Sequence, residues 1–310
     1  MDYKAFVEEQ VAAIRNAVGD GLAINALSGG VDSSVVTVLG HRALGDRLKT
    51  VFIDNALMRQ GEPQRVVQTF ADMCIPVELV DARRDFLQAL AGLTDPEDKR
   101  NAVTRTFYKG VFGELVRKSG AKYLLHGTIL TDIEETVAGI KRQHNILAQV
   151  GIDPQKEYGY HVLEPLETLR KDGVREVAQL LGLPPAVARR MPFPGPALAT
   201  RIVGEVTEER LDTVRAATAI VEEELAGTNV FQYMAVLLSD KATGIRDNQR
   251  EFGQIIVVRC VDSVDARAAT AVELPWDKLR RISARITQIP GVNRCLYDLT
   301  PKPPATIEYV

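Results

Sequence analysis

Cysteine, histidine and tryptophan are scarce in this 310-residue sequence, which holds three, four and one of them. The cysteines form no CxxC pair, which argues against a structural zinc site or a disulfide framework. The histidines are scattered without metal-ligand spacing. We therefore expect Cys74, Cys260 and Cys295 to be small buried hydrophobes rather than ligands.

An excess of basic residues is also missing, since 38 Lys and Arg face 41 Asp and Glu, for a formal net charge of -3. Such a balance gives no general attraction to polyanions, so nucleic acid is not an expected partner. The chain lacks any run of about 18 apolar residues that would cross a membrane. Its first 18 residues alternate apolar and charged positions at helical spacing, unlike a signal peptide. We expect a soluble, cytoplasmic protein.

Short apolar stretches alternate with helix-period segments through the first half of the chain. Strands are expected at residues 22–27, 50–54, 76–81 and 123–127, and helices at 33–44, 62–73 and 97–118. This alternation predicts a parallel sheet with helices on both faces. Ligands of such sheets bind beyond the carboxyl ends of the strands, which places candidate site residues at 28–34, 54–59, 81–84 and 127–132.

Three prolines within MPFPGP, residues 191–196, interrupt this pattern because proline fixes φ and removes a backbone donor. Beyond them, we expect strands at 198–203, 231–238, 254–261 and 292–299, and helices at 208–225 and 275–289. That order is typical of an α+β fold. The sequence therefore predicts two domains, 1–190 and 191–310.

The stretch SGGVDSS, residues 28–34, leaves a predicted strand and opens a predicted helix. Its glycines and the helix N-terminus expose backbone N–H groups, and its serines add hydroxyl donors, so the loop predicts an anion cradle. Asp32 beside phosphates implies a divalent cation, Mg²⁺, between them. No Gly-Lys-Ser/Thr of a Walker loop is present. The alternative is a tight turn in which Asp32 or Ser33 caps the helix.

SGGVDSS resembles the PP-loop of the N-type ATP pyrophosphatases, which cleave ATP between its α and β phosphates. Further stretches resemble the GMP synthetase branch of that family, in family order: FIDNALMR (52–59), DPEDKR (95–100), HGT (126–128), PFPGP (192–196) and KPPATIE (302–308). The resemblance spans nearly the whole chain. It implies a parallel-sheet, adenine nucleotide alpha hydrolase-like α/β domain followed by a smaller α+β domain for dimerisation and XMP binding.

The resemblance also implies a reaction and its partners. ATP would adenylate the xanthine 2-oxygen of XMP, releasing pyrophosphate, and ammonia would then displace AMP to give GMP. The expected cofactors are ATP and Mg²⁺. The ammonia would be free or delivered by a separate glutaminase subunit, and the C-terminal domain would build a homodimer.

Site residues follow from the same resemblance, position by position. Asp32, Lys141 and His144 match catalytic positions, the last two within a lid that closes on pyrophosphate, and Asp32 with Asp132 matches the metal region. The implied ATP contacts are Ser28, Gly29, Gly30, Val31, Asp32, Ser33, Ser34, Asp54, Gly127 and Thr128. The implied XMP contacts are Arg59, Gln232, Lys302, Thr306, Ile307 and Glu308.

Departures from the family pattern concentrate in residues 238–250, where only Gly244 and Arg250 match a segment that borders the purine site in the family. Glycines of the family are replaced by Ala56 and Ala197. These changes leave two alternatives open. The chain is then a paralogue that adenylates another acceptor, or a nucleotide-binding regulator without catalysis.

Overall fold

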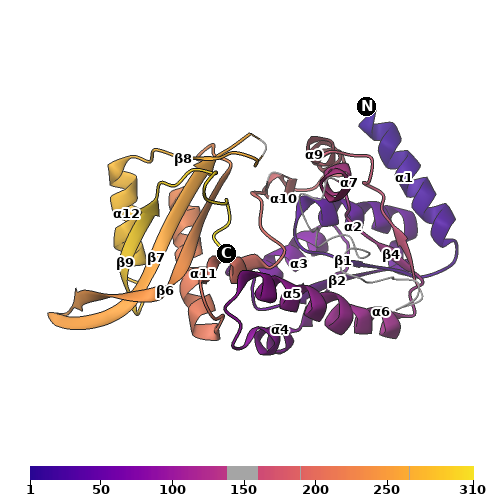
Figure 1. The fold of residues 1–310 in the computed structure, drawn as a ribbon. Helices are drawn as coiled ribbons and strands as arrows, with labels where there is room; N and C mark the ends of the chain where they lie inside the picture. Colours follow the sequence, from indigo (N-terminus) through magenta and orange to yellow (C-terminus); the bar gives the residue numbers. More distant parts are fainter. Residues whose placement is uncertain (138–159, 189, 265) are drawn as a thin grey trace. The chain divides into compact units, whose positions relative to one another are not determined.

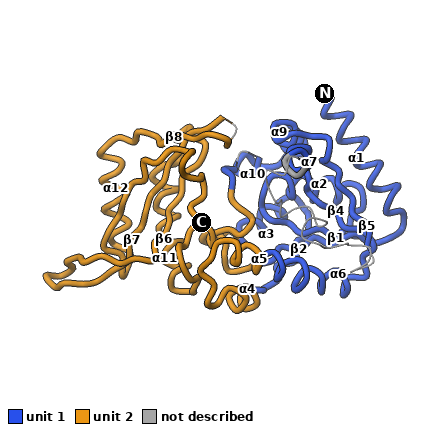
Figure 2. Tube along the Cα trace, in the orientation of Figure 1, with its two compact units in different colours: residues 1–54, 63–82, 104–192 blue, residues 55–62, 83–103, 193–310 orange. Residues whose placement is uncertain are grey.

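The structure is a computed structural model of residues 1–310, and it describes all of them except 138–159, 189 and 265. The described residues form two compact units, drawn in blue and orange in Figure 2. Unit 1 contains residues 1–54, 63–82 and 104–192, and unit 2 contains residues 55–62, 83–103 and 193–310. Two segments from the first half of the chain thus pack in unit 2. The domain limits 1–190 and 191–310 stay a prediction.

Unit 1 is built on a five-stranded parallel sheet with the strand order β3-β2-β1-β4-β5. This confirms the predicted α/β class. The strands are β1 (Ala23–Ala26), β2 (Leu48–Asp54), β3 (Glu78–Asp81), β4 (Tyr123–Leu125) and β5 (His161–Leu163). The sequence patterns did not predict β5, which is only three residues long and half-exposed.

The described helices of unit 1 are α1 (Tyr3–Val18), α2 (Val31–Leu44), α3 (Glu62–Asp72), α6 (Gly113–Ser119), α7 (Leu130–Val137), α9 (Lys171–Leu180) and α10 (Pro185–Ala188). Helices α1, α2 and α9 pack together on one face of the sheet, and α6 lies on the other (Figure 1). Asp2 caps α1 by accepting from the backbone N–H of Lys4 and Ala5, at 2.9 and 3.2 Å. The sheet interior is apolar, with Val51, Phe52 and Ile53 buried in β2.

Unit 2 contains a four-stranded sheet in which β6 (Gln232–Arg246) and β7 (Gln249–Asp262) form a long antiparallel hairpin. Asp247 and Asn248 at its turn have positive φ, 49° and 62°, as a two-residue hairpin turn requires. The other strands are β8 (Thr270–Ala271), antiparallel to β7, and β9 (Val292–Asp298), parallel to it. The helices are α4 (Arg83–Leu90), α5 (Pro96–Arg105), α11 (Glu208–Glu224) and α12 (Trp276–Ile286). This confirms the α+β prediction.

Two predicted elements differ in the structure. Residues 198–203 are not a strand, because Ala197–Arg201 form a short 3-10 helix that follows Pro196. The expected single helix over residues 97–118 is divided into α5, a π-helical segment Thr106–Phe112 and α6. The π segment packs Tyr108 and Phe112 in the core, and a widened helical turn of this kind changes which side chains face inward.

Candidate functional site

The nucleotide loop, residues 28–34, lies between the end of β1 and the first turn of α2. The Ser33 hydroxyl accepts from the backbone N–H of Ser28 at 3.2 Å and donates to the Gly30 carbonyl at 3.1 Å. Gly29 has φ 75°, which a side chain would strain. Gly30 is the N-cap of α2, so the free N–H groups of the first helical turn begin at Val31. The loop therefore has the cradle geometry that the sequence predicted.

A buried chain of polar contacts holds the loop against the sheet. Thr50 of β2 donates to Asn25 of β1, and Asn25 donates to Thr37 of α2, each at 2.7 Å. Thr37 in turn donates to the backbone carbonyl of Ser33 at 2.8 Å. The side chains of Asn25, Thr37 and Thr50 are all buried. Because buried polar groups are costly to leave unpaired, this chain fixes where Ser33 stands.

The loop lies at the point where the strand order reverses, between β1 and β4. Gly127 follows β4, and a Cβ placed on it would approach the Ser33 nitrogen to 3.2 Å and the Asp32 carbonyl carbon to 3.3 Å. A side chain there would press on the loop backbone. Since such switch points are where parallel sheets bind ligands, the structure brings residues 28–34 and Gly127 together as predicted.

Asp32 is the charged side chain of the nucleotide loop. Its Oδ2 is 2.6 Å from the Lys171 ammonium, at the start of α9. Its Oδ1 is buried and has no hydrogen-bond partner among the residues that the structure describes. An ionised carboxylate oxygen in that state suits a hard divalent cation such as Mg²⁺. The donor set at Asp32 therefore fits the predicted metal.

Other residues predicted to contact ATP lie near the carboxyl ends of the same strands. Asp54 is the last residue of β2, and its carbonyl accepts from Ala82 at 3.0 Å. Thr128 donates to Glu164 and lies 2.8 Å from His126 Nδ1. Burial lowers the pKa of the His126 imidazole to about 4, so the ring is neutral. Ser34 is fully buried behind the loop.

The structure describes Asp132 but not the two predicted lid residues. Asp132 stands in the first turn of α7, where its Oδ2 accepts from the Ile129 N–H at 3.1 Å. Asp132 is thus the third residue of α7, and its side chain reaches back to the N–H of the residue before the helix, as in a capping box. Its role toward a metal stays a prediction. Lys141 and His144 lie outside the described residues. Among the residues within 1–137, 160–188, 190–264 and 266–310, no group of three or more His, Cys, Asp and Glu side chains is arranged to hold a metal.

Unit 2 brings together three of the six residues predicted to contact XMP. The Arg59 guanidinium carbon lies 3.9 Å from the centroid of the Phe193 ring, and its Nε is 2.5 Å from Glu222. The Arg201 guanidinium carbon lies 4.8 Å from the same ring. Arg201 and Gln232 both donate to the Glu308 carboxylate. We call Arg59, Phe193, Arg201, Gln232 and Glu308 the arginine cluster.

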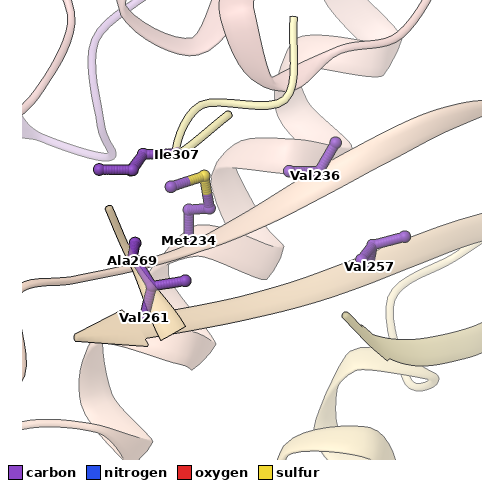
Figure 3. Close-up of a cluster of buried hydrophobic side chains, with 6 residues drawn as sticks. All are labelled: Met234, Val236, Val257, Val261, Ala269 and Ile307. Atoms are coloured by element: carbon purple, nitrogen blue, oxygen red, sulfur yellow. The ribbon is translucent and has the colours of Figure 1, made fainter. Parts of the chain in front are cut away.

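The C-terminal tail is anchored on the sheet beside this cluster. Ile307 packs with Met234, Val236, Val257, Val261 and Ala269, as Figure 3 shows. Arg259, fully buried, pairs with Asp298 at 2.6 Å. Its guanidinium also donates to the carbonyls of Thr300, Thr306 and Ile307, at 2.9, 3.0 and 3.2 Å. Backbone contacts thus fix the position from which Glu308 projects.

The remaining tail residues make local contacts. The Lys302 ammonium donates to the Ala266 carbonyl at 2.8 Å, and the Thr306 hydroxyl donates to the carbonyl of Glu308. Lys302 also pairs through its backbone with Ala269. The roles of Lys302 and Thr306 toward a ligand stay predictions.

Three cations of these sites were not found from the sequence. Lys171 pairs with Asp32, Arg190 donates to the Gly29 carbonyl at 2.7 Å, and Arg201 holds Glu308. Arg190 and Arg201 flank the PFPGP stretch, at residues 192–196, whose role the patterns left open. That proximity was the available signal for both. Lys171 had none, because it opens an ordinary amphipathic helix.

No helix in the part of the chain that the structure describes is long and apolar enough to cross a membrane. Among the described residues, the buried charged side chains are Glu62, Lys99, Arg201 and Arg259.

Comparisons with known proteins match the chain over its full length. The family model described as GMP synthase C terminal domain matches residues 219–309. A glutamine-hydrolyzing GMP synthase subunit of Archaeoglobus fulgidus is 51% identical over 310 residues, 100% of each chain. The same subunit of Pyrococcus horikoshii is 50% identical over 313 residues, again 100% of each. That of Methanopyrus kandleri is 46% identical over 99% of each.

A solved structure is also similar to the chain. It is an NH3-dependent NAD synthetase from Campylobacter jejuni in complex with the nitrate ion, with 16% identity and a TM-score of 0.48. The match covers 61% of this chain and 78% of that one. On its full-length relatives, at about half of all positions identical, the chain belongs to the family of the ATP-pyrophosphatase subunits of GMP synthase.

Proposed function

We propose that this protein adenylates XMP with ATP and releases pyrophosphate, and that ammonia then displaces AMP to form GMP. The observation that carries the proposal is the nucleotide loop at the switch point, where the buried Asp32 Oδ1 atom has no hydrogen-bond partner in the part of the chain that the structure describes. The relatives of the chain are GMP synthase subunits.

The first step forms a bond between the xanthine 2-oxygen and the α-phosphorus of ATP and breaks the bond to pyrophosphate. The N–H groups at the start of α2 and the loop hydroxyls bind the leaving pyrophosphate. The Lys171 ammonium, 2.6 Å from Asp32, supplies positive charge to the same place. These groups stabilise charge that develops on the leaving group.

The Asp32 carboxylate would hold Mg²⁺ here, and the ion would supply positive charge that neutralises the phosphates. Asp132 is the second proposed ligand. The contact of the Ser33 hydroxyl with the Gly30 carbonyl supports the turn that holds Asp32 at the helix N-terminus.

The second step forms a C–N bond at the purine C2 and expels AMP, since adenylation has turned the 2-oxygen into a good leaving group. In this scheme XMP binds to Arg59, Gln232 and Glu308 of the arginine cluster. Arg59 and Lys302 neutralise the 5′-phosphate, and Glu308 accepts a base N–H, with Gln232 beside it.

Ammonia comes from a separate glutaminase subunit, as the words "glutamine-hydrolyzing" in the names of the relatives suggest. We propose that the chain is a homodimer through its C-terminal domain, residues 191–310, and that residues 1–190 form the ATP-pyrophosphatase domain. The protein acts in the cytoplasm, without nucleic acid or membrane.

Residues 238–250, where the chain departs from its family, do not include any residue of the arginine cluster. They form the far part of the hairpin, which reaches past the rest of unit 2 (Figure 1). Arg246 there donates to the carbonyls of Thr287 and Val292, at 3.1 and 2.9 Å. The departures therefore fit a structural role for this arm, and none of them changes a residue of the arginine cluster.

The experiment incubates the purified protein with ATP, Mg²⁺, XMP and ammonium and measures AMP, pyrophosphate and GMP. We expect equal amounts of all three. Asp32→Asn lowers the rate at least about 100-fold, as the loss of a group that stabilises developing charge does. Asp20→Asn, in the exposed turn after α1, is the matched control and leaves the rate unchanged.

Two other results would separate the alternatives. Release of pyrophosphate with another carbonyl-bearing acceptor, but not with XMP, identifies a paralogue with a different substrate. ATP binding without pyrophosphate release for any acceptor identifies a regulator. ADP and orthophosphate as products would contradict the proposed role of the nucleotide loop itself.

A further inference from the structure

The DPEDKR stretch, residues 95–100, has no role in the proposed reaction, and half of its residues are exposed, yet its Lys99 is buried in unit 2. It opens helix α5, and the Asp95 side chain caps that helix by accepting from the N–H groups of Glu97 and Asp98, at 2.8 and 3.1 Å. Lys99 is 2% exposed. A lysine so deeply buried needs a specific partner.

The two cations of α5 reach two distant segments of the chain. The Lys99 ammonium donates to the Ile202 carbonyl at 2.7 Å. Arg100 donates to a terminal oxygen of Val310 at 3.0 Å. Ile202 directly follows Arg201, and Val310 lies two residues after Glu308. Helix α5 therefore donates hydrogen bonds to the backbone near both members of the Arg201–Glu308 pair.

The pair itself has a two-point geometry. Arg201 Nε is 3.3 Å from Glu308 Oε2, and its Nη2 is 3.2 Å from Oε1. Gln232 Nε2 lies 2.6 Å from Oε1. A carboxylate offers about four acceptor positions, so the three donors among the described residues leave one, on Oε2. The side chain of Arg201 is 1% exposed and that of Glu308 is 20% exposed. The remaining acceptor position is therefore on the more exposed of the two side chains, Glu308.

We propose that Arg201 is a positioning residue for acceptor recognition. Its two-point contact orients the Glu308 carboxylate and so directs the remaining lone pair. Helix α5 holds the backbone segments that carry Arg201 and Glu308. The inference rests on the proposed function, in which Glu308 accepts a base N–H of XMP. Arg201 touches no substrate in this account. A lysine in its place would keep the charge but not the fork that sets the carboxylate plane.

A purely structural ion pair predicts different energetics. If Arg201 only stabilised unit 2, the effects of substituting Arg201 and Glu308 on the KM for XMP would be additive. If it acts through Glu308, the two losses overlap, because residues that share one interaction are not additive. A double-mutant cycle on the KM for XMP separates these cases.

The experiment compares wild type with Arg201→Gln, Arg201→Lys, Glu308→Gln and the double Gln variant, using pyrophosphate release at varied XMP. We expect Arg201→Gln to raise the KM for XMP at least about 30-fold, the low end for breaking a buried charge pair. Arg201→Lys lies between it and wild type. The double variant stays within about 3-fold of Glu308→Gln, and the KM for ATP changes little in all of them.

Arg281→Gln is the matched control, because Arg281 pairs with Glu224 and Asp277 on the surface of the same unit. It leaves both KM values unchanged. If Arg201→Gln fails to fold, Arg201→Lys retains the buried charge and tests the geometry alone. An unchanged KM for XMP in Arg201→Lys and Arg201→Gln, or additive effects in the cycle, overturns the inference.

A second readout does not depend on catalysis. Hydrogen exchange of the amides of residues 302–310 in the substrate-free protein increases in Arg201→Gln and stays as in wild type in Arg281→Gln. If wild type releases no pyrophosphate with XMP, the proposed function fails, while the exchange result still decides whether Arg201 positions the tail. Unchanged exchange in Arg201→Gln counts against the positioning role.

Discussion

The nucleotide loop of unit 1 and the arginine cluster of unit 2 are built in opposite ways. The loop is seven consecutive residues whose contacts run mostly among themselves and to the adjoining helix. The cluster gathers side chains from residues 59, 193, 201, 232 and 308, and buried guanidinium groups hold it together. A local site of the first kind survives changes elsewhere, whereas an assembled site depends on remote anchors.

This contrast predicts that the stability of unit 2 depends strongly on Arg259, the buried arginine that anchors the tail. Arg259 is 0% exposed and ties Asp298 and three tail carbonyls together. Arg259→Gln removes the fully buried cation of the pair and leaves the Asp298 carboxylate, 12% exposed, without it. We expect a loss of about 3 kcal/mol in the free energy of unfolding of unit 2, the low end for breaking a buried pair. Denaturant unfolding followed through Trp276, in unit 2, measures it.

Arg281→Gln is the control here as well, because exposed ion pairs contribute at most about 1 kcal/mol. Equal losses in the two variants would show that the tail is not anchored through Arg259. Retained ATP binding by the Arg259→Gln protein would show that the damage stays in unit 2.

Lys171 tests the opposite region. Lys171→Met removes the cation that pairs with Asp32 at 2.6 Å and that the proposed mechanism assigns to pyrophosphate. We expect pyrophosphate release to fall about 100-fold, the effect of removing one such stabilising group, with the KM for XMP unchanged. Steady-state kinetics at varied ATP and XMP measures both.

Lys49→Met provides a matched comparison, since Lys49 pairs with Glu78 at 2.9 Å on the exposed side of the same sheet. It should keep full activity. A change in the KM for XMP rather than for ATP in Lys171→Met would remove Lys171 from the nucleotide site.

The same contrast explains which parts of the molecule the sequence could predict. The parallel sheet and the nucleotide loop follow from apolar runs, glycines and serines that lie within a few residues of one another. Arg201 meets Glu308 across 107 residues, and Lys171 meets Asp32 across 139. No periodicity links such pairs, and only tertiary packing brings them together. The KPPATIE resemblance supplied Glu308, but it could not supply the buried arginine behind it.

Secondary structure was missed where local propensity was overruled by packing. Residues 198–203 have the apolar content of a strand, yet the bend after Pro196 commits Ala197–Arg201 to a 3-10 turn whose side chains are buried. Without that turn Arg201 would not face the tail. The error therefore lies at the assembled site and not at the local one.

Lys99 gives the assembled site a pH dependence. Burial, followed by repulsion from Arg210, lowers the pKa of Lys99 to about 8, against about 10.4 in an unfolded chain. Between these values the unfolded state binds more protons, so the free energy of unfolding increases with pH. We expect unit 2 to gain about 1–2 kcal/mol between about pH 7.5 and 9.5 relative to Lys99→Met.

The measurement is the difference in unfolding free energy between wild type and Lys99→Met across that range. Lys278→Met, on α12 of the same unit, serves as the control and should keep the wild-type gain. A parallel pair of curves for wild type and Lys99→Met would show that Lys99 titrates normally and that α5 does not bury its charge.

The smallest effect concerns two alanines that stand where the family pattern has glycine. Ala56 and Ala197 have φ of 65° and 52°, in the left-handed region, which costs a residue with a Cβ about 1–2 kcal/mol. Ala56 is partly exposed, so Ala56→Gly relieves this strain and loses only the entropy of a more flexible unfolded chain. We expect a net gain of about 0.5–1 kcal/mol, measured by denaturant unfolding.

Ala197→Gly sharpens the comparison because Ala197 is fully buried. Its methyl group contributes about 0.8 kcal/mol of apolar burial, which offsets the relieved strain, so we expect almost no change. Ala56 precedes the loop that carries Arg59, and the Arg215 guanidinium holds its carbonyl at 2.5 Å. If Ala56→Gly instead destabilises the protein, the left-handed turn at residue 56 depends on its side chain rather than on Arg215.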